Sequence, residues 1–265
     1  MGKKEIPHTT THPHVNSQAI LGIDLFCLGF PDQALAQSEP AIAEARRLAH
    51  PVTLAVTLGC GAILLSLVGD DAALDEWVDQ LVAVTTEQDI PSWRALGTIH
   101  RGWVKVKNGD VTEGIFLLRN AMAAFRAIGA ELFMPRYIGL LARACELAGQ
   151  IQEAVTLLDD GLQIAGRTRE RWLEAELNRH KGQLLLRQGQ SEMAEDLYRK
   201  ALSVAKEQEA KLWELRTAMS LARLQHYQDR RAEARDRLAA VYGWFTEGFD
   251  TPDLKEAKAS LDELA

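Results

Sequence analysis

The chain has 265 residues, of which 47% are hydrophobic and 25% charged, with 30 Lys and Arg against 37 Asp and Glu. This composition is typical of a globular protein with a large buried core, and the net charge of −7 argues against nucleic-acid binding, which needs a basic face. We expect no membrane-spanning run, because about 18 consecutive apolar residues would be needed, and hence a cytoplasmic protein.

The first residues and the cysteines point to no special chemistry. Residues 1–14 have neither helical periodicity nor the apolar core of a secretory signal, so we expect a disordered leader. The three cysteines are odd in number and include no Cys-x-x-Cys pair, which predicts small buried side chains rather than disulfides or a zinc site. We therefore expect no metal and no cofactor.

From residue 15 onward the sequence repeats with a period of 40 residues. Glycine marks the repeat five times and aspartate once, at Gly29, Gly69, Gly109, Gly149, Gly189 and Asp229. The residue seven positions earlier is always small: Gly22, Ala62, Gly102, Ala142, Gly182 and Ala222. Five positions later most residues are small as well: Ala34, Leu74, Gly114, Ala154, Ala194 and Ala234. Slots are numbered below relative to the marked position, so that these sets are −7 and +5.

Each repeat predicts a pair of helices. The marked residue adopts the left-handed conformation that ends the first helix, helix A, and polar residues such as Asp70, Asp110 and Ser191 begin the second, helix B. The absence of proline between Pro135 and Pro252 favours an all-α chain. Since small residues allow close helix approach, we predict six hairpins over residues 15–250, stacked as a right-handed α-solenoid with one concave face.

Two prolines mark expected irregularities. Pro40 falls inside the first helix B and predicts a kink or an early break. Thr251 followed by Pro252 is a helix start, and apolar residues follow at helical spacing. We therefore predict a capping helix over residues 252–264, within a C-terminal segment 251–265, packed on the last helix B.

The small residues around a turn glycine resemble those of the tetratricopeptide repeat (TPR) family. That family has small residues at the −7, +5 and +12 slots, and slot +12 here holds Ala41, Leu81, Ala121, Gly161, Ala201 and Val241. The period of 40 exceeds the 34 residues of the family, which implies longer helices.

A second resemblance concerns residues 91–265. The strings ERWLEAELNRHKGQLLL (170–186) and VYGWFTEGFDTPDLKEAKASLDEL (241–264) are similar to the C-terminal TPR-like sensor region of bacterial signalling proteins. Those proteins carry an adenylate/guanylate cyclase or DNA-binding domain, then an AAA/STAND-type ATPase. The chain contains no G-x-x-x-x-G-K-[ST] phosphate loop, so the resemblance implies only the sensor or scaffold part.

Catalytic motifs are not found. Gly59-Cys60-Gly61 lies within a predicted helix with no strand before it, which indicates close packing rather than a nucleotide site. His100 and His180 share slot −9 two repeats apart, too far for one metal ion. We therefore expect no enzyme activity.

The concave face is the candidate binding site. In a TPR-like repeat, slots −13, −10, −6 and −2 of helix A line the groove, and in this acidic chain many of them hold arginine. The candidate binding residues are Arg136, Arg143, Arg179, Gln183, Arg187, Arg216, Arg223 and Tyr227, with Trp103 and Ile99 as an apolar shelf and Arg171 near the rim. Bidentate guanidinium groups suit carboxylates or phosphates. Glu176 works against this by neutralising one arginine.

Two further features bear on this groove. Gly59 and Gly139 share slot −10 and predict a notch in its floor. Alternatively, the longer helices shift the packing phase, in which case the apolar groove residues are core and the arginines form a solvated face.

We expect a non-catalytic interaction scaffold that binds an acidic peptide segment or a partner domain in this groove. The first alternative is a sensor of a small anionic effector, belonging to a cyclase- or ATPase-linked regulator. The second is self-association, for instance as a homodimer.

Overall fold

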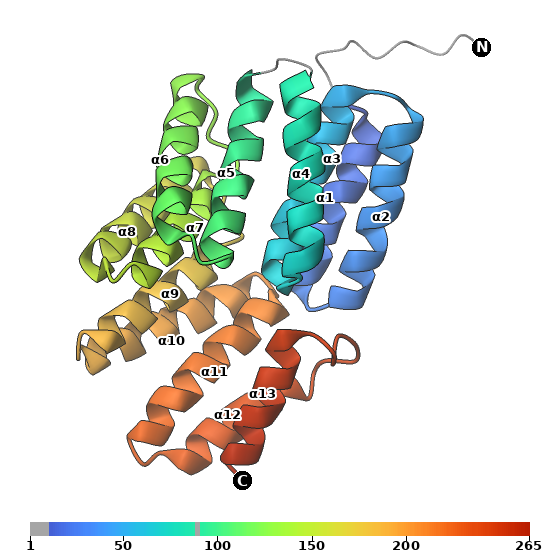
Figure 1. Ribbon diagram of the computed structural model, residues 1–265. Helices are drawn as coiled ribbons and strands as arrows, with labels where there is room; N and C mark the ends of the chain where they lie inside the picture. The colour runs from blue at the N-terminus through green and yellow to red at the C-terminus, as the bar shows by residue number, and fades with distance from the viewer. Residues whose placement is uncertain (1–10, 88–90) are drawn as a thin grey trace. The chain divides into compact units, whose positions relative to one another are not determined.

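The computed structural model describes residues 11–87 and 91–265, which form thirteen helices and no strand (Figure 1). The helices are α1 Pro13–Leu28, α2 Pro31–Arg47, α3 Pro51–Val68, α4 Asp71–Glu87, α5 Pro91–Lys107, α6 Val111–Ala127, α7 Met134–Leu147, α8 Ile151–Thr168, α9 Glu174–Arg187, α10 Ser191–Glu207, α11 Lys211–Tyr227, α12 Arg231–Tyr242 and α13 Pro252–Glu263. The odd-numbered helices up to α11 are helices A and their successors are helices B. This confirms the predicted all-α fold of six hairpins with a further C-terminal helix.

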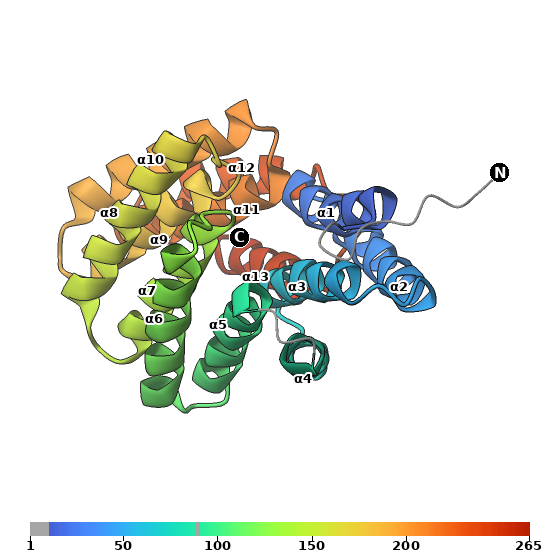
Figure 2. The same ribbon diagram turned by 90° about the horizontal axis from the view of Figure 1, so that it is seen from above.

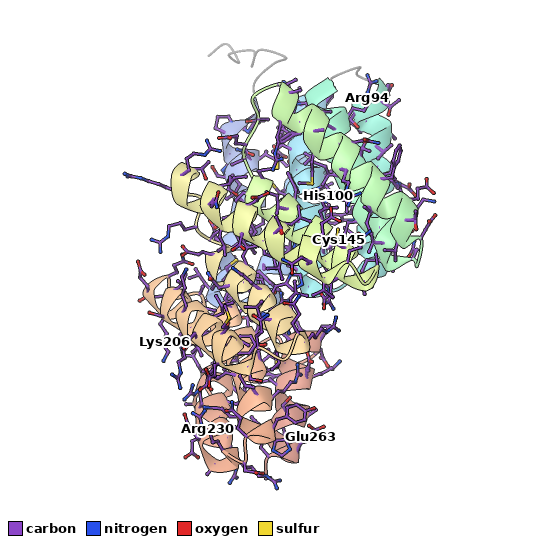
Figure 3. All side chains as sticks on the ribbon, turned by 90° about the vertical axis from the view of Figure 1, so that its left-hand side faces the viewer. Arg94, His100, Cys145, Lys206, Arg230 and Glu263 are labelled. Carbon is purple, nitrogen blue, oxygen red and sulfur yellow. The ribbon has the colours of Figure 1, made fainter. Side chains whose placement is uncertain are left out.

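The chain forms two compact units. The first contains the described residues up to Phe26 and Pro31–Ala130, and the second contains Cys27–Phe30 and Glu131–Ala265. A continuous superhelix over residues 15–250 stays a prediction. In the second unit, α8 and α10 lie outside α9 (Figure 2), and the exposed Lys206 lies near the end of α10 (Figure 3).

The turn between helix A and helix B follows the predicted conformation in every repeat. The backbone φ angle is +97° at Gly29, +87° at Gly69, +92° at Gly109, +76° at Gly149 and +78° at Gly189. Asp229 adopts the same left-handed conformation, with φ of +60°. A 40-residue pattern of single residues therefore locates all six hairpin turns, because the left-handed region is a local preference of glycine.

Replacing Asp229 with glycine is expected to stabilise the protein. A side chain in the left-handed conformation costs about 1 kcal/mol, which exceeds the entropy that glycine adds to the unfolded chain. Asp229→Gly should therefore raise the midpoint of urea denaturation, whereas Gly189→Ala should lower it. Gly189 is a clean counterpart, because an added Cβ there would meet no atom within 4 Å. A lower midpoint for Asp229→Gly would contradict this assignment.

Small residues bring the two helices of a hairpin into contact at slots −7 and +5. A Cβ built on Gly22 would lie 3.2 Å from the carbonyl oxygen of Ala34, and one on Gly182 would lie 3.2 Å from that of Ala194. In the third repeat both slots are glycine, and a Cβ on Gly114 would lie only 2.7 Å from the carbonyl oxygen of Gly102. Helix backbones therefore cross where larger side chains would keep them apart.

The N-terminal helices differ from expectation in two places. Helix α1 begins at Pro13, inside the segment 1–14 that we expected to be disordered. Residues 1–10 of that segment lie outside the described residues. Helix α2 continues through Pro40, so the predicted early break is wrong. Proline removes one backbone donor, but the helix propagates on both sides of it.

Helix α3 is more apolar than the sequence analysis expected. Its 18 residues, Pro51–Val68, are long and apolar enough to cross a membrane by length and composition alone. However, 78% of this segment is buried inside the protein, and core helices of soluble proteins pass the same test. Its burial within the helical array accounts for its apolar composition.

Helix α13 packs against α11 and α12. It begins at Pro252, whose fixed φ suits the first helical position. Leu254, Ala257 and Leu264 are buried. The Thr251 hydroxyl makes no capping hydrogen bond to the helix, which differs from expectation, and it donates instead to the carbonyl oxygen of Gly248, 2.6 Å away.

Candidate functional site

Eight of the candidate residues lie on helices A of the second unit. Arg136 and Arg143 lie on α7, Arg179, Gln183 and Arg187 on α9, and Arg216, Arg223 and Tyr227 on α11. Five of these arginines form ion pairs with carboxylates of the same unit. The ion pairs belong to two separate clusters and one exposed pair.

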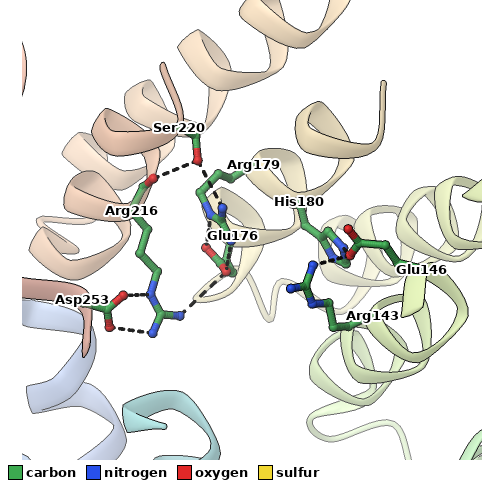
Figure 4. Close-up of polar contacts among 8 residues, drawn as sticks. All are labelled: Arg143, Glu146, Glu176, Arg179, His180, Arg216, Ser220 and Asp253. Carbon is green, nitrogen blue, oxygen red and sulfur yellow. Dashed lines mark hydrogen bonds and ion pairs between the residues drawn. The ribbon is translucent and has the colours of Figure 1, made fainter. Parts of the chain in front are cut away.

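The first cluster is a largely buried ionic network that joins α9, α11 and α13, with side-chain exposures of 14–18% for Glu176, Arg179 and Arg216 (Figure 4). Arg179 donates two hydrogen bonds to Glu176, of 2.7 and 2.6 Å, and a third to the Ser220 hydroxyl, of 3.2 Å. Arg216 donates two of 2.7 Å to Asp253 on α13, and its nearest contact to Glu176 is 3.7 Å. The predicted Glu176–arginine neutralisation is therefore confirmed.

The network shifts the pKa values of its members. Burial alone would raise the pKa of Glu176, but the charges of Arg179 and Arg216 outweigh it and lower the pKa to about 2. Burial likewise opposes the charge of Arg216, yet Asp253 raises its pKa above the ordinary value. Arg136 is buried on α7, and burial together with the charge of Arg216 lowers its pKa to about 10. The charges of Glu176, Arg179, Arg216 and Asp253 are held by attraction between the carboxylates and the arginines, which is the condition for burying them.

The second cluster centres on Glu146, a residue that the sequence analysis did not single out. Glu146 lies on α7 with only 3% of its side chain exposed. It accepts a hydrogen bond of 2.8 Å from Nε2 of His180 and forms an ion pair of 2.7 Å with Arg187, both on α9. It also accepts a hydrogen bond from Arg143 on its own helix (Figure 4). Because Arg143 and Glu146 are three residues apart, helical spacing could have signalled this pair.

Acid is expected to weaken the protein through Glu146. Burial alone would raise its pKa, but His180 and Arg143 lower it from 4.5 to about 2. A carboxyl whose pKa is lower when folded contributes stability above its unfolded pKa and loses it as the pH falls through the folded value. The free energy of unfolding should therefore decrease between about pH 5 and pH 2, by up to about 3 kcal/mol from this group. Urea denaturation of Glu146→Gln should show a flatter profile in this range than the wild type.

The third feature is a set of exposed side chains near the C-terminal ends of α7, α9 and α11. The exposed side-chain fractions are 47% for Arg143, 60% for Arg187 and 44% for Arg223. Arg223 pairs with Glu256 on α13 at 2.5 Å. Tyr227 is 83% exposed, and Leu147, which occupies the same slot −2 on α7, is 53% exposed. Three successive helices A thus present cationic and apolar groups to solvent at slots −6 and −2.

The expected apolar shelf is not present as an open surface. Ile99 is fully buried and Trp103 is 8% exposed, and both belong to α5 in the first unit. They are core residues, as the alternative of a shifted packing phase predicted for the apolar positions. The expected notches are filled too, because a Cβ on Gly59 would lie 2.9 Å from Leu96 and one on Gly139 3.3 Å from Leu177.

The expected rim residue, Arg171, contacts two carboxylates. It pairs with Glu174 at 2.6 Å and lies 3.7 Å from Glu207.

The three cysteines are buried, and burial raises the pKa of Cys60 to about 12. Within residues 11–87 and 91–265, no group of three or more His, Cys, Asp and Glu side chains could hold a metal ion.

Comparison of the sequence with known proteins identifies a distant relative. An uncharacterized protein of Rhizobium meliloti (strain 1021) is 24% identical over 192 residues, which is 72% of this chain. The chain spans about a fifth of the length of that relative, 19%. No protein-family model matches the chain.

Comparison of the structure finds helical repeat proteins. The kinesin light chain TPR-like repeats of Podosopora anserina are 23% identical with a TM-score of 0.52, covering 73% of this chain and 95% of theirs. A Rap protein complexed with Competence and Sporulation Factor is 12% identical with a TM-score of 0.66, covering 96% and 76%. NprR in complex with its cognate peptide NprX is 16% identical with a TM-score of 0.61, covering 97% and 73%. The chain therefore has the fold of a TPR-like helical repeat protein.

Proposed function

We propose that this chain is a non-catalytic interaction module that binds an acidic peptide or protein segment across the C-terminal ends of α7, α9 and α11. The observation that carries the proposal is the exposure of cationic and apolar side chains at slots −6 and −2 of these three helices, namely Arg143, Leu147, Arg187, Arg223 and Tyr227. Regular spacing of such groups suits an extended segment, which can contact one helix after another.

The charges favour an acidic partner even though the arginines are paired. The six arginines of the site share four carboxylates, those of Glu146, Glu176, Asp253 and Glu256. Two positive charges therefore remain in surplus. One belongs to the inner network, where Arg136 adds a third arginine to two carboxylates, and the other lies on the exposed arginines, where three guanidinium groups face Glu146 and Glu256. Tyr227 and Leu147 add apolar area beside it, which a partner side chain could cover.

Two of the similar structures support a peptide as the ligand. The Rap protein was solved with Competence and Sporulation Factor, and NprR with its cognate peptide NprX. Because the chain spans 19% of its longer relative, we further propose that it acts in the cytoplasm as the sensor arm of a larger signalling protein, in keeping with the resemblance to cyclase- and ATPase-linked regulators.

Removal of the positive charge from the exposed arginines tests this proposal. Arg143→Gln, Arg187→Gln and Arg223→Gln together should abolish binding to the acidic members of an array of peptides of varied charge, with the helical circular dichroism retained. Glutamine can still donate a hydrogen bond to the buried carboxylate of Glu146, whereas glutamate would repel it. Arg179 and Arg216 are left unchanged, because removing a buried charge would disrupt the network.

The matched control makes the same change of charge on the outer helices. Arg199→Gln, Lys200→Gln and Arg235→Gln replace exposed residues of α10 and α12. This control should bind acidic peptides as the wild type does. Equal loss of binding in both triple variants would indicate a non-specific charge effect and contradict the proposed site.

A further inference from the structure

Slot −13 forms a row of alternating charges across successive helices of the second unit. It holds Arg136 on α7, Glu176 on α9 and Arg216 on α11, and Asp253 on α13 continues the row. Each carboxylate in this row lies next to an arginine on a neighbouring helix. The row is buried and is completed by the chain itself.

Slot −6, two turns further along each helix, repeats this row with one difference. It holds Arg143 on α7, Gln183 on α9 and Arg223 on α11, and Glu256 on α13 continues it. The position that corresponds to Glu176 is therefore an uncharged amide. Gln183 has the length of a glutamate but carries no charge, so among the described residues Arg143 and Arg223 on either side pair only with Glu146 on α7 and Glu256 on α13.

The geometry points to a carboxylate binding site beside the Gln183 side chain, between Arg143 and Arg223. There an acidic side chain of the partner supplies the negative charge that this row lacks. This rests on the proposed function and adds to it the position and the chemical class of one anchoring group. The Gln183 amide can donate a hydrogen bond to the carboxylate, and Arg187 lies one helical turn away on α9. Arg143 and Arg223 supply positive charge from the two flanking helices.

The flanking helices are close enough to share one ligand with α9. Glu146 on α7 contacts His180 on α9 at 2.8 Å, and Arg179 on α9 contacts Ser220 on α11 at 3.2 Å. Packed helices have axes about 8–10 Å apart, a distance that long arginine side chains can bridge. The flanking arginines are 47% and 44% exposed, so a partner can reach them without displacing the core.

The contact between α11 and α13 shows how this surface holds carboxylates. Asp253 and Glu256, three residues apart on α13, pair with Arg216 and Arg223, seven residues apart on α11. An acidic residue on a protein segment is thus already accepted by the same two slots. This favours a carboxylate of a peptide over a free inorganic anion.

A substitution that supplies the missing carboxylate tests the site. We would measure binding of a fluorescein-labelled hexaglutamate peptide to the full chain by fluorescence anisotropy, with hexaglutamine as the uncharged probe. Gln183→Glu should weaken hexaglutamate binding at least tenfold, because the new carboxylate occupies the arginines and repels the peptide. Gln183→Met, which keeps the size without charge, should weaken it no more than about threefold. Gln152→Glu, at an exposed position of α8, adds the same charge outside the row and should leave the affinity unchanged.

A second measurement guards against a loss of folding. Gln183→Glu should keep or raise the midpoint of thermal unfolding, since its carboxylate completes the row. Wild-type affinity for hexaglutamate in Gln183→Glu would overturn the site, as would displacement of the peptide by an equal concentration of inorganic phosphate. If neutral peptides bind and hexaglutamate does not, this site is wrong while peptide binding stands. If no peptide of any composition binds, the proposed function fails as well.

Discussion

Deletion of residues 250–265 is expected to lower the midpoint of thermal unfolding or to cause aggregation. The deletion removes α13, whose Leu254 and Ala257 are buried within the second unit. Without it, α11 and α12 would expose apolar surface at the open end of the helical array, where repeat proteins need a cap. Differential scanning calorimetry and light scattering of the truncated chain measure the two outcomes.

The ion pair between α11 and α13 should account for a large part of this effect. Arg216→Ala would leave Asp253 buried without its two hydrogen bonds of 2.7 Å. Removing one partner of a buried pair costs roughly 3–5 kcal/mol. In a protein of this size, each kcal/mol of lost stability lowers the melting temperature by about 2–4 °C.

An exposed ion pair between Lys255 of α13 and the segment before this helix provides the control. Lys255 lies 3.4 Å from Asp250 at the surface, and exposed pairs contribute little. Lys255→Ala should therefore melt within a degree or two of the wild type. A melting curve for the truncated chain or for Arg216→Ala that matches the wild type would show that α13 is not a stabilising cap.

Gly114→Ala adds only one methyl group, but we expect it to destabilise the third hairpin strongly. The added Cβ would lie 2.7 Å from the carbonyl oxygen of Gly102 and 3.0 Å from the backbone nitrogen of Val106. Backbone atoms cannot rotate away as a side chain can, so α5 and α6 must separate. Overpacking of this kind costs about 1–3 kcal/mol, and urea denaturation followed by circular dichroism would measure it.

Gly166→Ala is the matched substitution at a helical glycine without a neighbour. No atom lies within 4 Å of the Cβ that this change would add on α8. Alanine should stabilise the helix there by up to about 1 kcal/mol, because it favours the helical conformation. The opposite signs separate close packing from helix propensity. Stabilisation by Gly114→Ala would contradict the tight crossing of α5 and α6.

The sequence by itself determined the helices and the turns between them. Residues at 40-residue spacing, from Gly29 to Asp229, all adopt the left-handed turn conformation, and Pro252 begins the last helix. These features depend on backbone preferences of single residues and on contacts between residues close in sequence. Such local physics can be read from a linear pattern, which is why the number and order of hairpins were predictable.

The tertiary structure decided which charges are paired and which side chains are exposed. Arg216 and Asp253 form an ion pair because α13 packs against α11. Glu146 forms ion pairs with arginines of both α7 and α9. Ile99 occupies a groove position by its slot number but is buried. Pairing and burial depend on the register and rotation of one helix against the next. Successive residues point about 100° apart around a helix axis, so a shift of one residue turns a different side chain toward the neighbouring helix. A repeat pattern places residues at equivalent positions along the helices, whereas the packing between helices decides what each of them contacts.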